Sequence, residues 1–244
     1  MKNIALILFV FFSYCALGQQ NENYDEPSRT IDSLLSLLTT AKDDTNKVNC
    51  LNNLCSEYIY IGNYENGLRH GNVGLQLATE IKFQKGIANA FNNIGRIHDN
   101  KGEYDKALEF HLKALSIREK IGDKKGMAGS YNNIGLVHDV KGDYDKAIEY
   151  YLKALGINIE TGNEYWASIN YNNIGGIYHS KGSLLCRQCN CTNDEGNYDK
   201  ALDYFFKSLE IKERISNKKD LGISYGCIGI ILYEISEYKK AMEY

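Results

Sequence analysis

The sequence lacks the features that mark most enzymes, nucleic-acid-binding proteins and membrane-spanning domains. Its 28 Lys and Arg residues against 31 Asp and Glu residues give a net charge of −3, which leaves no broad basic surface for nucleic acid. It has no Gly-rich phosphate loop, no nucleophile elbow and no metalloprotease helix. Its longest apolar run, residues 4–12, is shorter than the roughly 20 residues that a helix needs to cross a bilayer. We therefore predict no catalytic activity, no cofactor and no nucleic-acid partner.

The N-terminal residues have the composition of a secretory signal peptide. A short basic start, Met1-Lys2, precedes the apolar run, and Ala16-Leu17-Gly18 has the small-x-small form of a cleavage site. We expect residues 1–18 to be removed and the protein to be exported, as a periplasmic or secreted protein. Cys15 leaves lipoprotein processing open as an alternative, although Phe12-Ser13-Tyr14 lacks the small residue that such processing prefers.

A short sequence motif recurs along the chain at a fixed interval of 40 residues. Its four copies are Leu51-Asn-Asn-Leu, Phe91-Asn-Asn-Ile-Gly, Tyr131-Asn-Asn-Ile-Gly and Tyr171-Asn-Asn-Ile-Gly. A period of this length is typical of arrays in which one supersecondary unit is stacked on the next. The chain is therefore predicted to be a repeat protein without a single central core.

Each copy contains two amphipathic helices. In the third copy the first apolar stripe is formed by Tyr131, Ile134 and His138, at helical spacing. A break at Lys141-Gly142 follows, and a second stripe then begins at Tyr144 and includes Ala147, Tyr151 and Ala154. The small residues Gly135 and Ala147 occupy places where the two helices must approach closely. Ala147 should accordingly be almost wholly buried.

This order of residues resembles the tetratricopeptide repeat family. The family signature places an aromatic residue, Leu, Gly and Tyr on the first helix and Ala, Phe and Ala on the second, and the third copy matches it with Tyr131, Ile134, Gly135, His138, Ala147, Tyr151 and Ala154. The family repeat has about 34 residues, with a proline near its end. The repeat here is longer, and the only proline, Pro27, lies outside the array. Kinesin light chains and the Leu-Gly-Asn-type spindle-orientation adaptors resemble it in repeat length. The resemblance implies an all-α fold, a right-handed α-solenoid of antiparallel helix pairs.

The recurring motif also predicts the domain organisation. Residues 19–43 should form a leader and a capping helix, and residues 44–244 the array. Its units are expected at 44–83, 84–123, 124–163, 164–217 with an insertion at 183–196, and 218–244, which is truncated. First helices are predicted at 44–61, 84–101, 124–141, 164–181 and 218–235, and second helices at 64–81, 104–121, 144–161 and 198–215.

A signal peptide followed by such an array resembles the exported N-terminal region of bacterial signalling proteins, in which a membrane helix and a histidine kinase, nucleotide cyclase or DNA-binding domain follow. The resemblance implies a protein- or peptide-binding scaffold that serves as an extracytoplasmic input or interaction region. Contact with a membrane would then require an anchor beyond Tyr244.

The free face of the first helices lines the concave groove in the tetratricopeptide family. The residues that helical geometry places on or beside this face are Asn52, Asn92, Asn93, Arg96, Asp99, Asn132, Asn133, Asp139, Asn172 and Asn173. A carboxamide offers both a donor and an acceptor, so a row of Asn side chains suits the backbone of an extended peptide. The alternative is that one Asn of each pair bonds to a neighbouring helix or to the preceding backbone.

The insertion in the fourth unit contains Cys186, Cys189 and Cys191. Thiols at this spacing suit zinc or copper, with His179 as a conceivable fourth ligand, whereas an oxidising compartment favours a disulfide. Free thiols are the third possibility. The alternative function is therefore a metal- or redox-responsive module that acts through residues 183–196.

Overall fold

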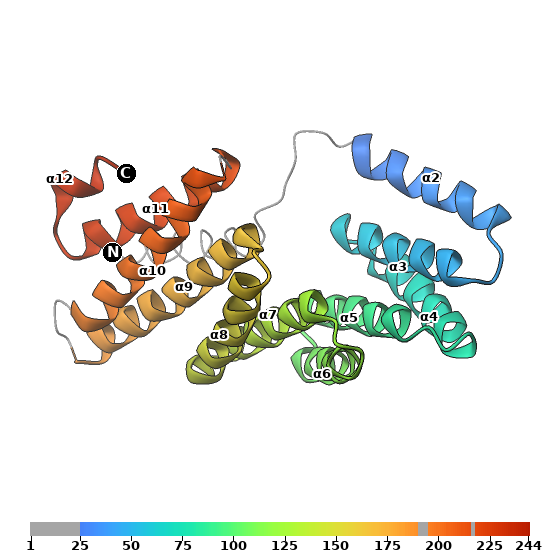
Figure 1. Cartoon of the computed structure of the whole chain (residues 1–244). Helices are drawn as coiled ribbons and strands as arrows, with labels where there is room; N and C mark the ends of the chain where they lie inside the picture. Colours follow the sequence, from blue (N-terminus) through green and yellow to red (C-terminus); the bar gives the residue numbers. More distant parts are fainter. Residues whose placement is uncertain (1–24, 190–194, 216–217) are drawn as a thin grey trace.

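The computed structural model describes residues 25–189, 195–215 and 218–244. All regular structure in these residues is helical, and no strand occurs among them. The helices are stacked in a curved row (Figure 1). A first set comprises α3 (Thr45–Tyr60), α5 (Gln84–Asn100), α7 (Lys124–Val140), α9 (Glu164–Cys189) and α11 (Lys218–Glu234). A second set comprises α4 (Tyr64–Glu80), α6 (Tyr104–Ile121), α8 (Tyr144–Glu160), α10 (Glu195–Arg214) and the short α12 (Tyr238–Ala241).

Consecutive helices pack as neighbours throughout the array. Each first helix contacts the second helix that follows it, and each of α4, α6, α8 and α10 also contacts the next first helix. In Figure 1, α6 and α8 lie on the outer side of the curve, below α5 and α7. The predicted solenoid of helix pairs is therefore confirmed, and away from the insertion the helix ends agree with the prediction to within one residue.

The turn inside each of the first three pairs contains a glycine with positive φ, and the turn between α11 and α12 has Ser236 in its place. α7 ends where Gly142 adopts a left-handed conformation with φ +77°, a region that side chains disfavour. The backbone N–H of Asp143 then donates to the carbonyl of His138 at 2.8 Å, as in a Schellman motif. The turn reverses the chain within three residues, so the second helix packs back on the first.

Close packing between the paired helices depends on small residues, as predicted. Ala147 has 0% exposure, which confirms its expected burial. A Cβ atom on Gly135 would lie 2.8 Å from Cδ1 of Tyr151, and one on Gly95 would lie 2.7 Å from Cε1 of His111. Each large ring of the second helix thus occupies the space that the missing side chain leaves.

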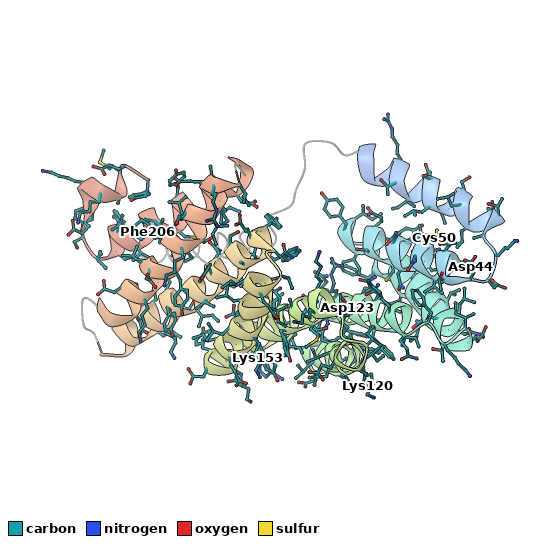
Figure 2. The ribbon with its side chains drawn as sticks, in the orientation of Figure 1. Asp44, Cys50, Lys120, Asp123, Lys153 and Phe206 are labelled. Carbon is teal, nitrogen blue, oxygen red and sulfur yellow. The ribbon has the colours of Figure 1, made fainter. Side chains whose placement is uncertain are left out.

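The first helix of the array is covered by α2 (Asp25–Thr40). Ile31 of α2 is buried in a cluster with Leu54 and Tyr58 of α3. Cys50 lies between the two helices (Figure 2), and its Sγ donates to the carbonyl of Leu34 at 3.2 Å. No described helix, α2 included, is both long enough and apolar enough to cross a membrane.

The prediction of a loop at 183–196 was wrong where the structure describes it. α9 continues to Cys189 in place of ending near residue 181, and α10 begins at Glu195. Residues 183–189 contain neither glycine nor proline, and a Cβ on Gly182 would contact the ring of Tyr198 at 3.3 Å. Gly182 is therefore packed within a helix and is not a turn residue. The side chains of Cys186 and Cys189, and all of Cys191, fall outside the described residues, so their predicted chemistry stays a prediction.

Candidate functional site

The paired Asn residues connect successive first helices through their side chains. The Nδ2 of Asn133 donates to Oδ1 of Asn92 at 3.0 Å, and Nδ2 of Asn173 donates to Oδ1 of Asn132 at 3.3 Å. Asn93 makes the equivalent contact to the backbone carbonyl of its partner, the O of Asn52, at 2.9 Å. The second Asn of each pair therefore makes a hydrogen bond to the preceding repeat. This is the alternative that the sequence had left open.

A small polar hollow of about 190 Å³ lies between α3 and α5. Its lining consists only of carboxamides and one hydroxyl: Asn52, Asn53, Ser56, Asn89, Asn92 and Asn93. Asn52 contributes from below, because its side chain is only 4% exposed and its Nδ2 donates to the carbonyl of Gly86 at 3.1 Å. Its Oδ1 has no hydrogen-bond partner. Asn52 is therefore not the freely exposed rung that its position in the helix suggested, and its Oδ1 is buried near Gly74 of α4.

Arg96 lies beside the hollow, half-buried. Its Nη1 donates to Oγ of Ser56 at 3.2 Å, and burial lowers the pKa of its guanidinium. The contact joins α5 to α3 next to the asparagines. Arg96 thus lies at the edge of the polar surface, and its predicted role in the groove stays a prediction.

The two aspartates predicted for the groove turn toward the second helix of their own repeat. Oδ2 of Asp99 accepts from Nε2 of the fully buried His111 at 2.8 Å. Asp139 lies close to Tyr144 and Tyr151, and burial raises the pKa of its carboxyl to about 6. Both side chains take part in the packing inside their repeat. Asp99 bonds to His111, and Asp139 lies close to Tyr151. The expectation that they face a ligand is therefore corrected.

The row of asparagines ends at α9. Oδ1 of Asn132 accepts from both Asn170, at 3.0 Å, and Asn173. The next residue that could donate in the same way, to Asn172, is Cys227 of α11, and Oδ1 of Asn172 is buried without a partner. The asparagine contacts described here thus extend from α3 to α9, and His179 and Glu234 join α9 to α11.

A buried polar position in the second helices was missed in the sequence. Arg118 of α6 donates from Nη1 to Oγ of Ser130 at 2.7 Å, twelve residues later. Asn158 donates to Asn170 and Lys212 to Ser224 with the same separation and at 2.8 Å. In the first repeat the two places are held by Ala78 and Ala90. The sequence did contain a signal for these contacts. A polar residue near the end of a second helix is followed, twelve residues later, by a polar residue of the next first helix.

No group of three or more His, Cys, Asp or Glu side chains in the described parts of the chain is arranged to hold a metal. His179, which the sequence offered as a fourth ligand for the cysteines, is buried, and its Nε2 lies 2.8 Å from Oε2 of Glu234. It contributes to the contact between α9 and α11.

Models of known families match two segments of the array. The description of both is tetratricopeptide repeat, and the matched residues are 87–121 and 128–158. These two segments of the chain therefore match the tetratricopeptide repeat. No curated protein matches the chain.

Solved structures resemble the whole array. BtubC (BKLC) from P. vanneervenii is 19% identical with a TM-score of 0.69, covering 89% of this chain and 84% of that one. The apo form of RapI is 20% identical with a TM-score of 0.70, covering 88% of this chain and 76% of that one. The signal transduction ATPase PH0952 from Pyrococcus horikoshii, described as having a tetratricopeptide repeat sensor, is 19% identical, with a TM-score of 0.69 over 90% of this chain and 35% of that one. At this identity the likeness establishes the fold alone.

Tetratricopeptide repeats generally mediate binding between proteins, and proteins built from them are typically scaffolds without enzymatic activity. The array described above has the same architecture. A protein-interaction scaffold is thus the functional class that the repeats indicate.

Proposed function

We propose that the chain binds an extended segment of another protein along the first helices, with the hollow between α3 and α5 as one contact site. The observation that carries this proposal is the lining of the hollow, which consists of five asparagines and one serine. An apolar or charged lining would favour a particular side chain. Carboxamides and hydroxyls instead match the alternating N–H and C=O groups of a peptide backbone.

The internal hydrogen bonds leave both kinds of group available in the hollow. Oδ1 of Asn92 and Oδ1 of Asn89 accept from the protein interior, so their Nδ2 groups remain as donors. The exposed Asn53, which also lines the hollow, carries an acceptor in its Oδ1. Each hydrogen bond to a backbone contributes about 0.5–1.5 kcal/mol net, so binding requires several along the row.

Filling the hollow should abolish binding without unfolding the protein. We expect Asn53→Tyr to weaken capture of extended peptides at least about tenfold, because the exposed Asn53 lines the hollow and a tyrosine there adds bulk within it. The matched control is Asn72→Tyr, on the exposed outer face of α4, which leaves the hollow unchanged. Binding would be measured as the recovery of phage that display random peptides.

Both variants should retain the helical circular dichroism and the melting temperature of the unchanged protein. Equal recovery of displayed peptides by Asn53→Tyr and Asn72→Tyr would contradict the hollow as a contact site. Loss of recovery by both would show that added bulk on any surface interferes.

We further propose that the array is exported and serves as the input region of a signalling protein. Support comes from the small-x-small site at Ala16-Leu17-Gly18 after an apolar run, and from the likeness to a signal transduction ATPase with a repeat sensor. In a Gram-negative host we expect a periplasmic protein whose N-terminal residue, by Edman sequencing, is Gln19. Ile7→Arg, which places a charge in the apolar run, should keep the chain in the cytoplasm. A cytoplasmic protein that retains Met1 in both cases would refute export.

A further inference from the structure

Arg118 places a buried positive charge beneath the hollow. Its side chain is only 6% exposed, on α6, and its guanidinium donates to four oxygens. These are the carbonyl of Gly126 at 2.9 Å, Oγ of Ser130 at 2.7 Å, Oδ1 of Asn89 at 3.1 Å and Oδ1 of Asn92 at 3.4 Å. All four acceptors are neutral, and Nε has no partner.

Arg118 makes no direct salt bridge inside the repeat, although the carboxylate of Asp123 lies near it. Burial lowers the pKa of its guanidinium and the charge of Asp123 (Figure 2) opposes this effect, but an arginine stays protonated at neutral pH. The carboxylate of Asp123 accepts instead from the backbone N–H of Gly126 at 3.1 Å. A buried charge that lacks a direct salt bridge is costly, since desolvation is only partly offset by neutral hydrogen bonds and a nearby carboxylate. The site thus favours a negative charge nearby.

Arg118 also fixes the orientation of two carboxamides in the hollow. A guanidinium only donates, so the oxygens of Asn89 and Asn92 must face it and their NH₂ groups must face the other way. Asn133 donates to the same oxygen of Asn92 and reinforces this orientation. Both asparagines line the hollow, which therefore presents two N–H donors with a positive charge behind them.

Two further cations lie near the hollow, and an acidic residue, Glu57, follows Asn53 by one turn of α3. Arg96 bonds to Ser56, a lining residue, and Lys85 is exposed one turn before Asn89 on α5. The nearest acidic side chain on this helix, Asp99, is bound to His111. An anionic group in the hollow would thus meet donors and cations and no free carboxylate of α5.

We infer that the hollow selects an acidic side chain, Asp or Glu, of the bound segment, and that Arg118 is the positioning residue that aims the donors of Asn89 and Asn92. This inference rests on the proposed peptide binding. The row of asparagines begins at the hollow with Asn52 and continues to Asn132 and Asn172 on α7 and α9, so one end of a segment that follows the row lies near the hollow. Peptides with amidated and with free C-termini distinguish a side-chain carboxylate from a terminal one.

Two pools of synthetic nonapeptides test the inference, both with random sequence and amidated C-termini, one with Glu and one with Gln at the central position. Fluorescence anisotropy at low ionic strength should show about tenfold tighter binding of the Glu pool, because hydrogen bonds to a charged acceptor are roughly twice as strong as neutral ones. Raising the salt concentration should reduce this preference, because the charges near the mouth of the hollow are screened.

The double variant Asn89→Asp with Asn92→Asp supplies a sharp control. Each aspartate keeps an oxygen for Arg118 but replaces the outward donor by an acceptor, so the fold should be retained and the preference for the Glu pool lost. In Arg118→Gln the ratio of Glu-pool to Gln-pool affinity should fall to about one, while binding of the Gln pool persists. A purely structural role of Arg118 would lower both affinities together.

The outcomes separate this inference from the proposed function. Equal binding of both pools by the unchanged protein would overturn selection of a carboxylate and leave peptide binding intact. Tighter binding of a Gln pool with a free C-terminus than of the amidated Glu pool would overturn the choice of a side chain over a terminus. Failure to bind any pool would count against the peptide groove itself.

Discussion

Replacing Tyr151 by alanine is expected to lower the free energy of unfolding by about 3–5 kcal/mol, the range found for large aromatic residues in protein cores. Tyr151 has 0% exposure, and its ring fills the space left by Gly135 on the facing helix. Alanine would leave a cavity between α7 and α8 that a glycine cannot fill. Urea denaturation followed by circular dichroism measures the loss.

Tyr151→Phe provides the matched control. The hydroxyl of Tyr151 is buried without a hydrogen-bond partner, so its removal should leave the stability unchanged or raise it by about 1 kcal/mol. The fourth repeat already has a phenylalanine, Phe205, against its own Gly175. A marked destabilisation by Tyr151→Phe would show that the hydroxyl makes a hydrogen bond, and Asp139 is the nearby acceptor.

Asp139→Asn is expected to stabilise the protein at neutral pH by about 1–3 kcal/mol, and to have little effect near pH 3. Burial raises the pKa of the Asp139 carboxyl to about 6, above the value of about 3.9 in an unfolded chain. The folded state therefore prefers the protonated form. The favourable contribution is complete below about pH 4, is lost as the pH rises toward 6, and is absent at pH 7.

The difference in unfolding free energy between the two proteins isolates this effect. Other carboxyls shift in the opposite direction; Lys106, His98 and Lys101 hold the pKa of Glu103 at about 2, for example. Their contribution rises with pH and cancels when Asp139→Asn is subtracted from the unchanged protein. A difference that does not vary between pH 3 and pH 7 would contradict a raised pKa at Asp139.

The helical repeat was predictable because its cues are local and are repeated. A stripe of apolar residues, a Gly at the turn and a small residue at the contact recur every 40 residues, so each copy corrects the interpretation of the others. The end of α9 was not predictable in this way. Its Lys181-Gly182 matches the turns of the other copies, and only packing against Tyr198 shows that the helix continues.

The site was predictable in outline and not in detail. The sequence located the row of asparagines, but adjacent helical residues differ by only 100° in direction. The inward turn of Asn93, Asn133 and Asn173 depends on how one repeat is stacked on the next, across 41 residues. Arg118 was not predicted as a site residue because no other repeat has an arginine at its position. Its polar partner Ser130, twelve residues later, could have been recognised in the sequence.

The side-chain contacts between first helices also change in chemical character along the array. From α3 to α9 they are made by neutral carboxamides, each of which joins residues 41 positions apart in the sequence. Between α9 and α11 the contact is made instead by His179 and Glu234 at 2.8 Å. The last junction of the array therefore depends on ionisable side chains, whereas the earlier ones do not.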